Sequence, residues 1–194
     1  MKCIGITGGV GAGKSIILEY LPKLCSCKIS QADQIAWRLE EKDGPCYLPL
    51  LDLLGDQILA EDGSIDRKKM SSLIFPDEDL VKAVNAIVHP AVLDEIKREI
   101  KEAARAGNDY YFLEAALLIE GKCDTVMDEV WYVYAPKKER LRRLKHDRGY
   151  TEAKALSIMK RQMTEKEFRS HADRVIRNDR DPAFVERQLR KWLT

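Results

Sequence analysis

The feature that most constrains this fold is a glycine-rich segment near the start of the chain, GITGGVGAGKS (5–15). Its residues Gly8, Gly13, Lys14 and Ser15 match the spacing G-x-x-x-x-G-K-[ST]. A short apolar run of strand type comes before this segment, and an apolar pattern of helical type begins directly after it. Because the motif requires strand, loop and helix in this order, we expect a phosphate-binding loop here.

The chemistry of this loop follows from its residue types. Glycine accepts positive φ angles and lets the backbone approach a ligand closely, while successive N–H groups and the following helix N-terminus attract an anion. Lys14 would reach the β- and γ-phosphates of a nucleotide, and the Ser15 hydroxyl would bind Mg²⁺. Two alternatives stay open at this point: an ordinary glycine-rich turn, or a dinucleotide site, which would give Lys14 and Ser15 no role.

Apolar runs that alternate with helical patterns indicate an α/β fold with a parallel sheet. The runs at 110–113 and 129–135 are almost continuously apolar, which is typical of strands buried on both faces. We therefore expect a three-layer P-loop NTPase-type architecture, with helices on both faces of the sheet and functional groups at the carboxyl ends of its strands. Further strands are expected at 27–30 and 174–177, and core helices at 14–24, 32–41 and 182–193.

Two insertions into this core are expected. Residues 34–107 contain short helical pieces and turns rather than a plain βα repeat, and we interpret them as a helical substrate-binding insertion. In it, His89-Pro90 is expected to separate a helix over 79–88 from one over 91–106, because the residue before proline avoids the α region. Residues 137–171 would form a small lid. The core of this single domain would then comprise about 1–33, 108–136 and 172–194.

Two carboxylates follow strands that end at the same edge of the expected sheet. Asp33 comes just after the second strand, where it could orient a substrate hydroxyl or accept its proton, or simply stabilise the start of a helix. Glu114 ends the 110–113 strand at the place of a Walker-B-type acid, where it could hold Mg²⁺ through water or pair with a cation such as Lys14. Both are candidates for the substrate site. His89 is a third candidate, with a structural role as its alternative.

A basic run, KKERLRRLKHDR at 137–148, carries seven lysines and arginines against two acidic residues in an otherwise balanced chain. A solvated helix face is one interpretation. The other is an arginine lid, because phosphoryl transfer needs cations over the transferring group and the planar fork of arginine suits phosphate. We expect Arg143 to act in catalysis and regard Arg142 and Arg148 as further lid candidates.

The composition argues against several functional classes. The formal net charge of +1 gives no overall field for nucleic acid or a membrane surface, and no apolar stretch approaches the roughly 20 residues that span a bilayer. The five cysteines show no paired zinc-ligand spacing, so we expect free thiols in a reducing cytosol. The amino terminus is expected to be a core strand rather than a signal peptide, and the protein to be a cytoplasmic monomer or weak homo-oligomer.

Taken in order, these motifs resemble the dephospho-CoA kinase family along nearly the whole chain. The glycine-rich segment by itself is typical of an entire superfamily of nucleotide-binding proteins, but the later segments are more specific. The most distinctive of them is NAIVHPAV at 85–92. The other matching segments are Ala32-Asp33, LLGDQIL, DGSIDRKKM, ALLIE and the pattern A-D-x-V-I-x-N that ends at Asn178.

The resemblance implies a nucleotide-binding core, a helical domain for the CoA substrate and a lid. It also implies transfer of the γ-phosphate of ATP to the ribose 3′-hydroxyl of dephospho-CoA, with Mg²⁺, as the last step of coenzyme A synthesis. Asp33 matches the family's catalytic aspartate. The stretch that matches the family's ATP-binding residues consists of Gly11, Ala12, Gly13, Lys14, Ser15 and Ile16.

The chain departs from the family pattern at several positions. Gln31 stands where the first aspartate of a D-A-D motif is usual, and Arg140 replaces the usual lid glutamine. Asp147 occupies the slot of a second lid arginine, with Arg148 one residue further on. Another small-molecule P-loop kinase, such as a nucleoside monophosphate kinase, and a degenerate nucleotide-binding protein without turnover stay open as alternatives. A GTP-dependent switch would need a guanine-reading N-K-x-D, which 178–181 does not supply.

Overall fold

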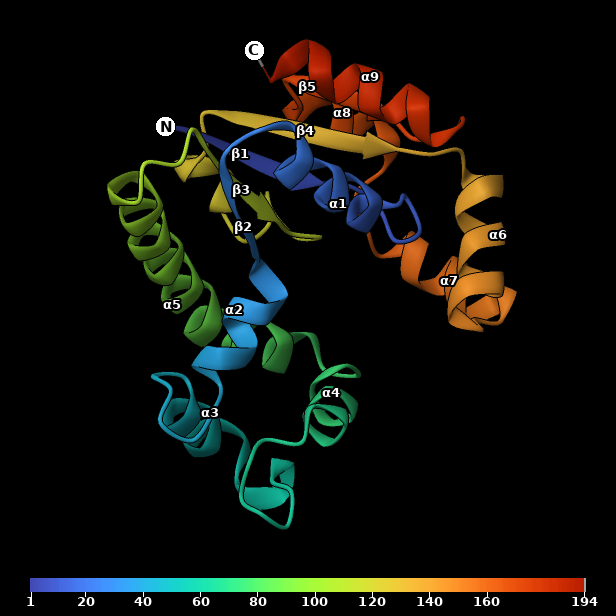
Figure 1. The fold of residues 1–194 in the computed structure, drawn as a ribbon. Helices are drawn as coiled ribbons and strands as arrows, with labels where there is room; N and C mark the ends of the chain where they lie inside the picture. Colours follow the sequence, from blue (N-terminus) through green and yellow to red (C-terminus); the bar gives the residue numbers. More distant parts are fainter. Residues whose placement is uncertain (194) are drawn as a thin grey trace. The chain divides into compact units, whose positions relative to one another are not determined.

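The computed structural model describes residues 1–193 of the chain. The chain forms two compact units, which we describe separately: Met1–Ser30 together with Ile100–Thr194, and Gln31–Glu99. The strands of a β-sheet lie in the first unit, except for the last residue of one of them, and the second unit is helical (Figure 1). No helix within residues 1–193 combines the length and the apolar character that crossing a membrane requires.

Five strands form the sheet in the spatial order β2-β3-β1-β4-β5. β1 pairs in parallel with both β3 and β4, and β4 pairs in parallel with β5. The chain leaves β1 towards β2 on one side and leaves β3 towards β4 on the other, so a crevice is expected at the carboxyl ends of β1 and β3. The strands are β1 (Lys2–Thr7), β2 (Cys27–Gln31), β3 (Tyr110–Glu114), β4 (Glu129–Tyr134) and β5 (Arg174–Arg177).

Helices cover both faces of the sheet in the first unit, which confirms the three-layer α/β prediction (Figure 1). On one face, apolar residues of the first and last helices pack on Ile4 and Ile6 of β1. On the other face, the ring of Phe168 stacks on Tyr132 of β4 at a centroid distance of 4.9 Å. The helices of this unit are α1 (Lys14–Leu24), α6 (Lys137–Arg148), α7 (Glu152–Lys160), α8 (Glu165–His171) and α9 (Pro182–Trp192), with a 3₁₀ turn η2 (Cys123–Val126).

Local sequence signals explain where several of these helices begin. Thr164 and Glu167 form a reciprocal capping box before α8, which satisfies two backbone donors that the helix leaves open. The Asp181 side chain accepts a hydrogen bond from the Phe184 N–H at the start of α9, and Pro182 occupies the first turn, where its missing N–H costs nothing. These caps explain why α8 and α9 begin at Glu165 and Pro182.

The second unit consists of short helices and one long helix. Its elements are α2 (Ala32–Leu39), α3 (Tyr47–Leu54), a 3₁₀ turn η1 (Asp56–Ile58), α4 (Arg67–Ile74) and α5 (Glu78–Arg105), the last residues of which belong to the first unit. The predicted break at His89-Pro90 is wrong, because α5 runs through Pro90 without interruption.

Burial on both sides of the proline explains this difference. The valines at 84, 88 and 92 and Ile96 follow one another at intervals of four residues, and all four are buried. An apolar stripe of this kind requires one continuous helix. Packing along it outweighs the cost of about 3 kcal/mol that a proline imposes on a helix interior.

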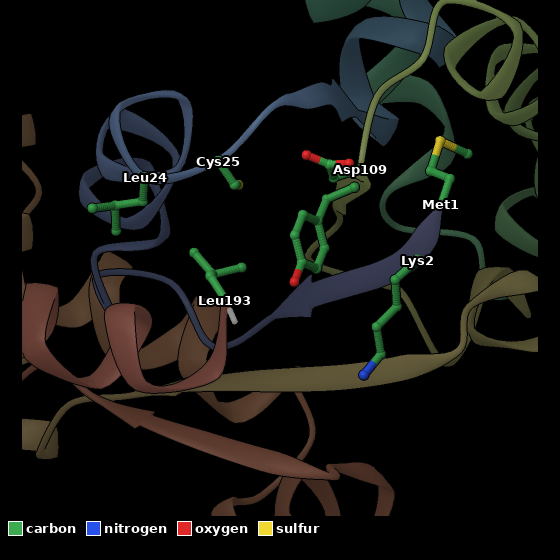
Figure 2. A pocket seen from close by; sticks show the side chains of 7 residues that line it. Met1, Lys2, Leu24, Cys25, Asp109 and Leu193 are labelled. Carbon is green, nitrogen blue, oxygen red and sulfur yellow. The ribbon is translucent and has the colours of Figure 1, made fainter.

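A cavity of about 630 Å³ lies at the amino-terminal ends of β1 and β3, away from the glycine-rich loop (Figure 2). Its walls come from the starts of these two strands and from the ends of α1 and α9. Figure 2 shows the side chains that line it, which are Met1, Lys2, Leu24, Cys25, Asp109, Tyr110 and Leu193. Cys25 is a free thiol here, as are the other four cysteines.

Candidate functional site

The phosphate loop, residues 8–15, connects β1 to α1 and has the backbone that the glycines predict. Gly11 and Gly13 have φ angles of 78° and 88°, in the left-handed region that other residues rarely adopt. At Gly13 there is also no room for a side chain, because a Cβ would collide with the amide nitrogen of Asn178. The N–H groups of Gly11 and Gly13 donate to no acceptor within residues 1–193, so they can bind an anion.

Lys14 and Glu114 meet at the carboxyl ends of β1 and β3. The Lys14 ammonium donates to the Gly8 carbonyl at 2.8 Å and lies 3.4 Å from the Glu114 carboxylate. Both side chains are mostly buried. The contact between Glu114 and the loop lysine is one of the two roles that the position of Glu114 predicted. The two contacts of Lys14 hold its ammonium over the loop.

Arg143 is the predicted lid arginine that contacts the phosphate loop. Its guanidinium donates to the Ala12 carbonyl at 3.2 Å and to the Asn178 carbonyl at 2.9 Å. Its third partner is the Glu139 carboxylate at 2.9 Å. This side chain is 16% exposed, whereas that of Arg142 is 63% exposed. Of the three predicted lid arginines, Arg143 is therefore the one whose hydrogen bonds direct it at the loop.

Arg142 and Arg148 lie on the outer side of α6. Arg142 pairs with Glu139 at 2.7 Å, and Arg148 is exposed. Hydrogen bonds from Arg142, together with those from Arg143, lower the pKa of Glu139 to about 2, so this carboxylate stays ionised at neutral pH. Arg148 remains a lid candidate that the structure does not place against the loop.

Comparisons with known proteins agree with this geometry. The family profile described as Dephospho-CoA kinase matches residues 2–183. The chain belongs to the dephospho-CoA kinase family. A dephospho-CoA kinase of Carboxydothermus hydrogenoformans is 37% identical over 99% of this chain and 95% of its own length. One from Bacillus cereus is 34% identical over 97% and 96%, respectively.

Solved structures show the same fold. The crystal structure of TT1252 from Thermus thermophilus superposes with a TM-score of 0.83 at 30% identity, covering 99% of this chain and 96% of that one. A dephospho-CoA kinase from Campylobacter jejuni has a TM-score of 0.73 at 21% identity, with coverages of 100% and 96%. A shikimate kinase from Acinetobacter baumannii has a TM-score of 0.57 at 17% identity, with coverages of 100% and 93%. This last match reflects a P-loop kinase fold.

Two residues predicted for the substrate site of a dephospho-CoA kinase lie in the second unit. Asp33 occupies the first turn of α2 and is exposed. Its carboxylate has no hydrogen-bond or ion-pair partner within residues 1–193, so a substrate hydroxyl would meet no competitor there. His89 lies inside α5 and is partly buried. The catalytic role of Asp33 and the substrate contact of His89 stay predictions.

Three residues around the loop were not predicted for the site. The Asn178 amide donates to the Ala12 carbonyl at 2.8 Å, and the Gln162 amide oxygen accepts from the Val10 N–H at 2.8 Å. The Arg140 guanidinium donates to the Val10 carbonyl at 2.8 Å. Asn178 carried a signal, because it ends a family motif, and Arg140 stood out as a departure from the family pattern. Gln162 carried none, since an isolated glutamine in a polar segment predicts no contact.

Proposed function

We propose that this chain catalyses the reaction of its family, in which ATP and dephospho-CoA give ADP and coenzyme A. The observation that carries the proposal is the family match over residues 2–183, together with relatives that the match covers over 95% and 96% of their length. In this reaction the bond between the γ-phosphorus and the β–γ bridging oxygen breaks. A new bond forms between the γ-phosphorus and the ribose 3′-oxygen, and the hydroxyl proton leaves.

The first unit supplies the groups that bind phosphate. The open N–H groups of Gly11 and Gly13 and the ammonium of Lys14 would hold the phosphate oxygens of ATP. Arg143 is already oriented by the Ala12 carbonyl and Glu139, so it can stabilise negative charge on the transferring group with little reorganisation. These contacts position the phosphate and balance its charge, which is most of what a phosphoryl transferase must do.

We assign to Asp33 the role of orienting the nucleophile, which is the ribose 3′-hydroxyl, and of accepting its proton. The exposed carboxylate of Asp33 would accept a hydrogen bond from the 3′-hydroxyl of dephospho-CoA and aim its oxygen at the γ-phosphorus, taking the proton as the new bond forms. We assign residues 34–107 to substrate binding and residues 137–171 to the lid. We also propose that the protein is cytoplasmic and is a monomer or a weak homo-oligomer.

Oxygen donors beside the loop suit Mg²⁺, which prefers carboxylates, hydroxyls and phosphate oxygens. The Ser15 hydroxyl is exposed and makes no hydrogen bond within residues 1–193. Glu114 brings a carboxylate to the same loop through its contact with Lys14. We propose that Ser15 binds the ion directly and Glu114 through water. The ion would supply charge neutralisation between the β- and γ-phosphates.

The test is product formation by the purified protein. With ATP and dephospho-CoA we expect coenzyme A and ADP in equal amounts, and no phosphorylation when a nucleoside monophosphate replaces dephospho-CoA. Asp33→Asn should lower kcat by about 100-fold or more, the usual contribution of a positioned base, while ATP affinity is retained. Glu186→Gln is the control, because this carboxylate lies on α9, outside the substrate-binding and lid segments, and pairs with Arg190 at 2.7 Å. Absence of coenzyme A would refute the proposal, and full turnover by Asp33→Asn would remove Asp33 from it.

A further inference from the structure

Arg140 reaches from α6 to the amino-terminal half of the phosphate loop. Its Nε donates to the Val10 carbonyl at 2.8 Å, and its Nη2 lies 3.4 Å from the amide oxygen of Gln162. The guanidinium is so close to Gly9 that a Cβ there would lie 2.5 Å from its Cζ. Arg140 therefore packs on the loop backbone, while Arg143 holds the Ala12 side of the same loop.

The charge of Arg140 has no acidic partner. Within residues 1–193 no carboxylate forms a hydrogen bond or ion pair with it, whereas Arg142 and Arg143 on the same helix share Glu139. Its side chain is partly buried, and this burial lowers its pKa from the ordinary value for arginine. A cation held away from water without a counter-charge costs free energy. An anion bound beside it would remove that cost.

The surroundings of Arg140 add further positive charge. It lines a cavity of about 460 Å³ whose wall also contains Lys137 and Lys160. The acidic residue in this wall, Glu165, is paired with Arg169 at 2.8 Å. The cavity that Arg140 lines is therefore electropositive.

We propose that Arg140 is a polyphosphate-binding residue of this chain, whose guanidinium contacts phosphate oxygens of bound ATP at the Gly9–Val10 end of the loop. The proposal rests on the proposed function only for the identity of the nucleotide. The planar guanidinium of Arg140 uses Nε to hold the Val10 carbonyl and leaves donors on Nη1 and Nη2 for the ligand. These donors would strengthen the grip of the loop on the triphosphate.

The experiment compares ligand binding by Arg140→Gln, Arg140→Lys and the wild type, using calorimetric titration with ATP and with inorganic tripolyphosphate. We expect Arg140→Gln to weaken both ligands by about tenfold, the effect of losing one charge-assisted contact. The dependence of Kd on NaCl concentration should become shallower, because one ionic contact is missing. The melting temperature of the ligand-free protein should not fall, since the substitution removes an uncompensated charge.

Arg140→Lys and Arg190→Gln complete the design. The lysine variant keeps the charge but lacks the fork, so it should lose less affinity and retain the steep salt dependence. Arg190→Gln makes the same charge change on the exposed side of α9, where the arginine is paired with Glu186. This variant should bind both ligands as the wild type does.

Two outcomes with Arg140→Gln would overturn the inference. One is unchanged affinity of Arg140→Gln for both ligands. The other is weaker binding with an unchanged salt dependence and a lower ligand-free melting temperature, which would make Arg140 a tether of the loop only. If Arg140→Gln does not fold, the test rests on Arg140→Lys, for which we expect a partial loss of affinity. Kd values and a salt dependence equal to those of the wild type would then overturn the inference. Failure of the proposed function is distinguishable, because it would appear as absent coenzyme A in the wild type.

Discussion

The two ends of β1 carry similar side chains in opposite arrangements. At the amino-terminal end, Glu129 binds Lys2 at 2.5 Å and Arg174 at 2.9 Å, and it accepts a third hydrogen bond from the Trp131 indole. At the carboxyl end, Lys14 and Arg143 also pair with carboxylates, but Arg140 has none among its contacts within residues 1–193.

The backbone follows the same division. Near the amino-terminal end, the N–H groups of Cys3 and Val130 donate to the carboxylates of Asp128 and Asp173. In the phosphate loop, the N–H groups of Gly11 and Gly13 stay open within residues 1–193. Paired charges stabilise a fold, and open donors and cations bind ligands. β1 thus separates an end whose charges are paired, which we call the stabilising end, from an end that also keeps open N–H donors and a cation without a carboxylate partner, which we call the binding end.

The largest effect should come from comparing one lysine at each end. Lys14→Met removes a charge that the loop directs at the phosphates, so we expect kcat/KM to fall by about 100-fold or more. Lys2→Met should leave kcat/KM unchanged and lower the free energy of unfolding by less than about 1 kcal/mol, because Lys2 is 42% exposed. Steady-state kinetics and urea unfolding measure the two effects. Equal losses of activity would break the comparison.

The next effect concerns stability and pH. Although burial opposes it, hydrogen bonds from Arg174, Lys2 and Trp131 lower the pKa of Glu129 from 4.5 to about 2. A lowered carboxyl pKa stabilises the folded state above the unfolded value, here by on the order of 3 kcal/mol at neutral pH. This contribution is lost as the pH falls from about 4.5 towards 2.

Glu129→Gln tests that contribution. We expect it to lower the free energy of unfolding by about 3 kcal/mol at pH 7, and the gap to the wild type to narrow in urea titrations as the pH is lowered below 4.5. Activity per folded molecule should stay the same. A gap that is independent of pH would show that charge at Glu129 is not the source of the stabilisation.

A smaller effect is expected at Asn178, which supports the binding end. Asn178→Ala removes the hydrogen bond to the Ala12 carbonyl, so the loop should lose part of its fixed shape and ATP affinity should fall by about tenfold. Gln188→Ala is the control, because that amide also bonds backbone groups, those of Arg177 and Phe184, which lie outside the loop. If both variants bind ATP alike, the support of Ala12 is unimportant.

Much of this architecture could be predicted because its signals are local. The strand, loop and helix around the glycines, the later strands and the α9 helix follow from patterns a few residues long. The continuity of α5 could not, since it depends on the burial of Val88 and Val92 on either side of a proline. At this proline, tertiary packing outweighed the local tendency of proline to interrupt a helix.

The arginines of α6 show the same limit. The number of arginines predicts a cationic helix, but which of these arginines contact the loop depends on how the helix is rotated. Leu144 fixes that rotation, because it is buried close to Gly11. Arg140 lies one turn before Leu144 and so faces the loop. This signal was present in the sequence, yet only packing shows that Leu144, rather than Leu141, is the buried residue.

Gly13 and Asn178 illustrate how strongly distant parts of this chain depend on each other. The carboxamide fills the volume that any substituent on the Gly13 α-carbon would need. Neither position can take a larger residue alone: a methyl group at 13 displaces the amide, and a bulkier residue at 178 distorts the turn. A larger side chain at one end of this polypeptide therefore requires a compensating change at the other end. Chimaeras that exchange the carboxyl-terminal segment between relatives should remain active only when an asparagine, or something smaller, faces that glycine.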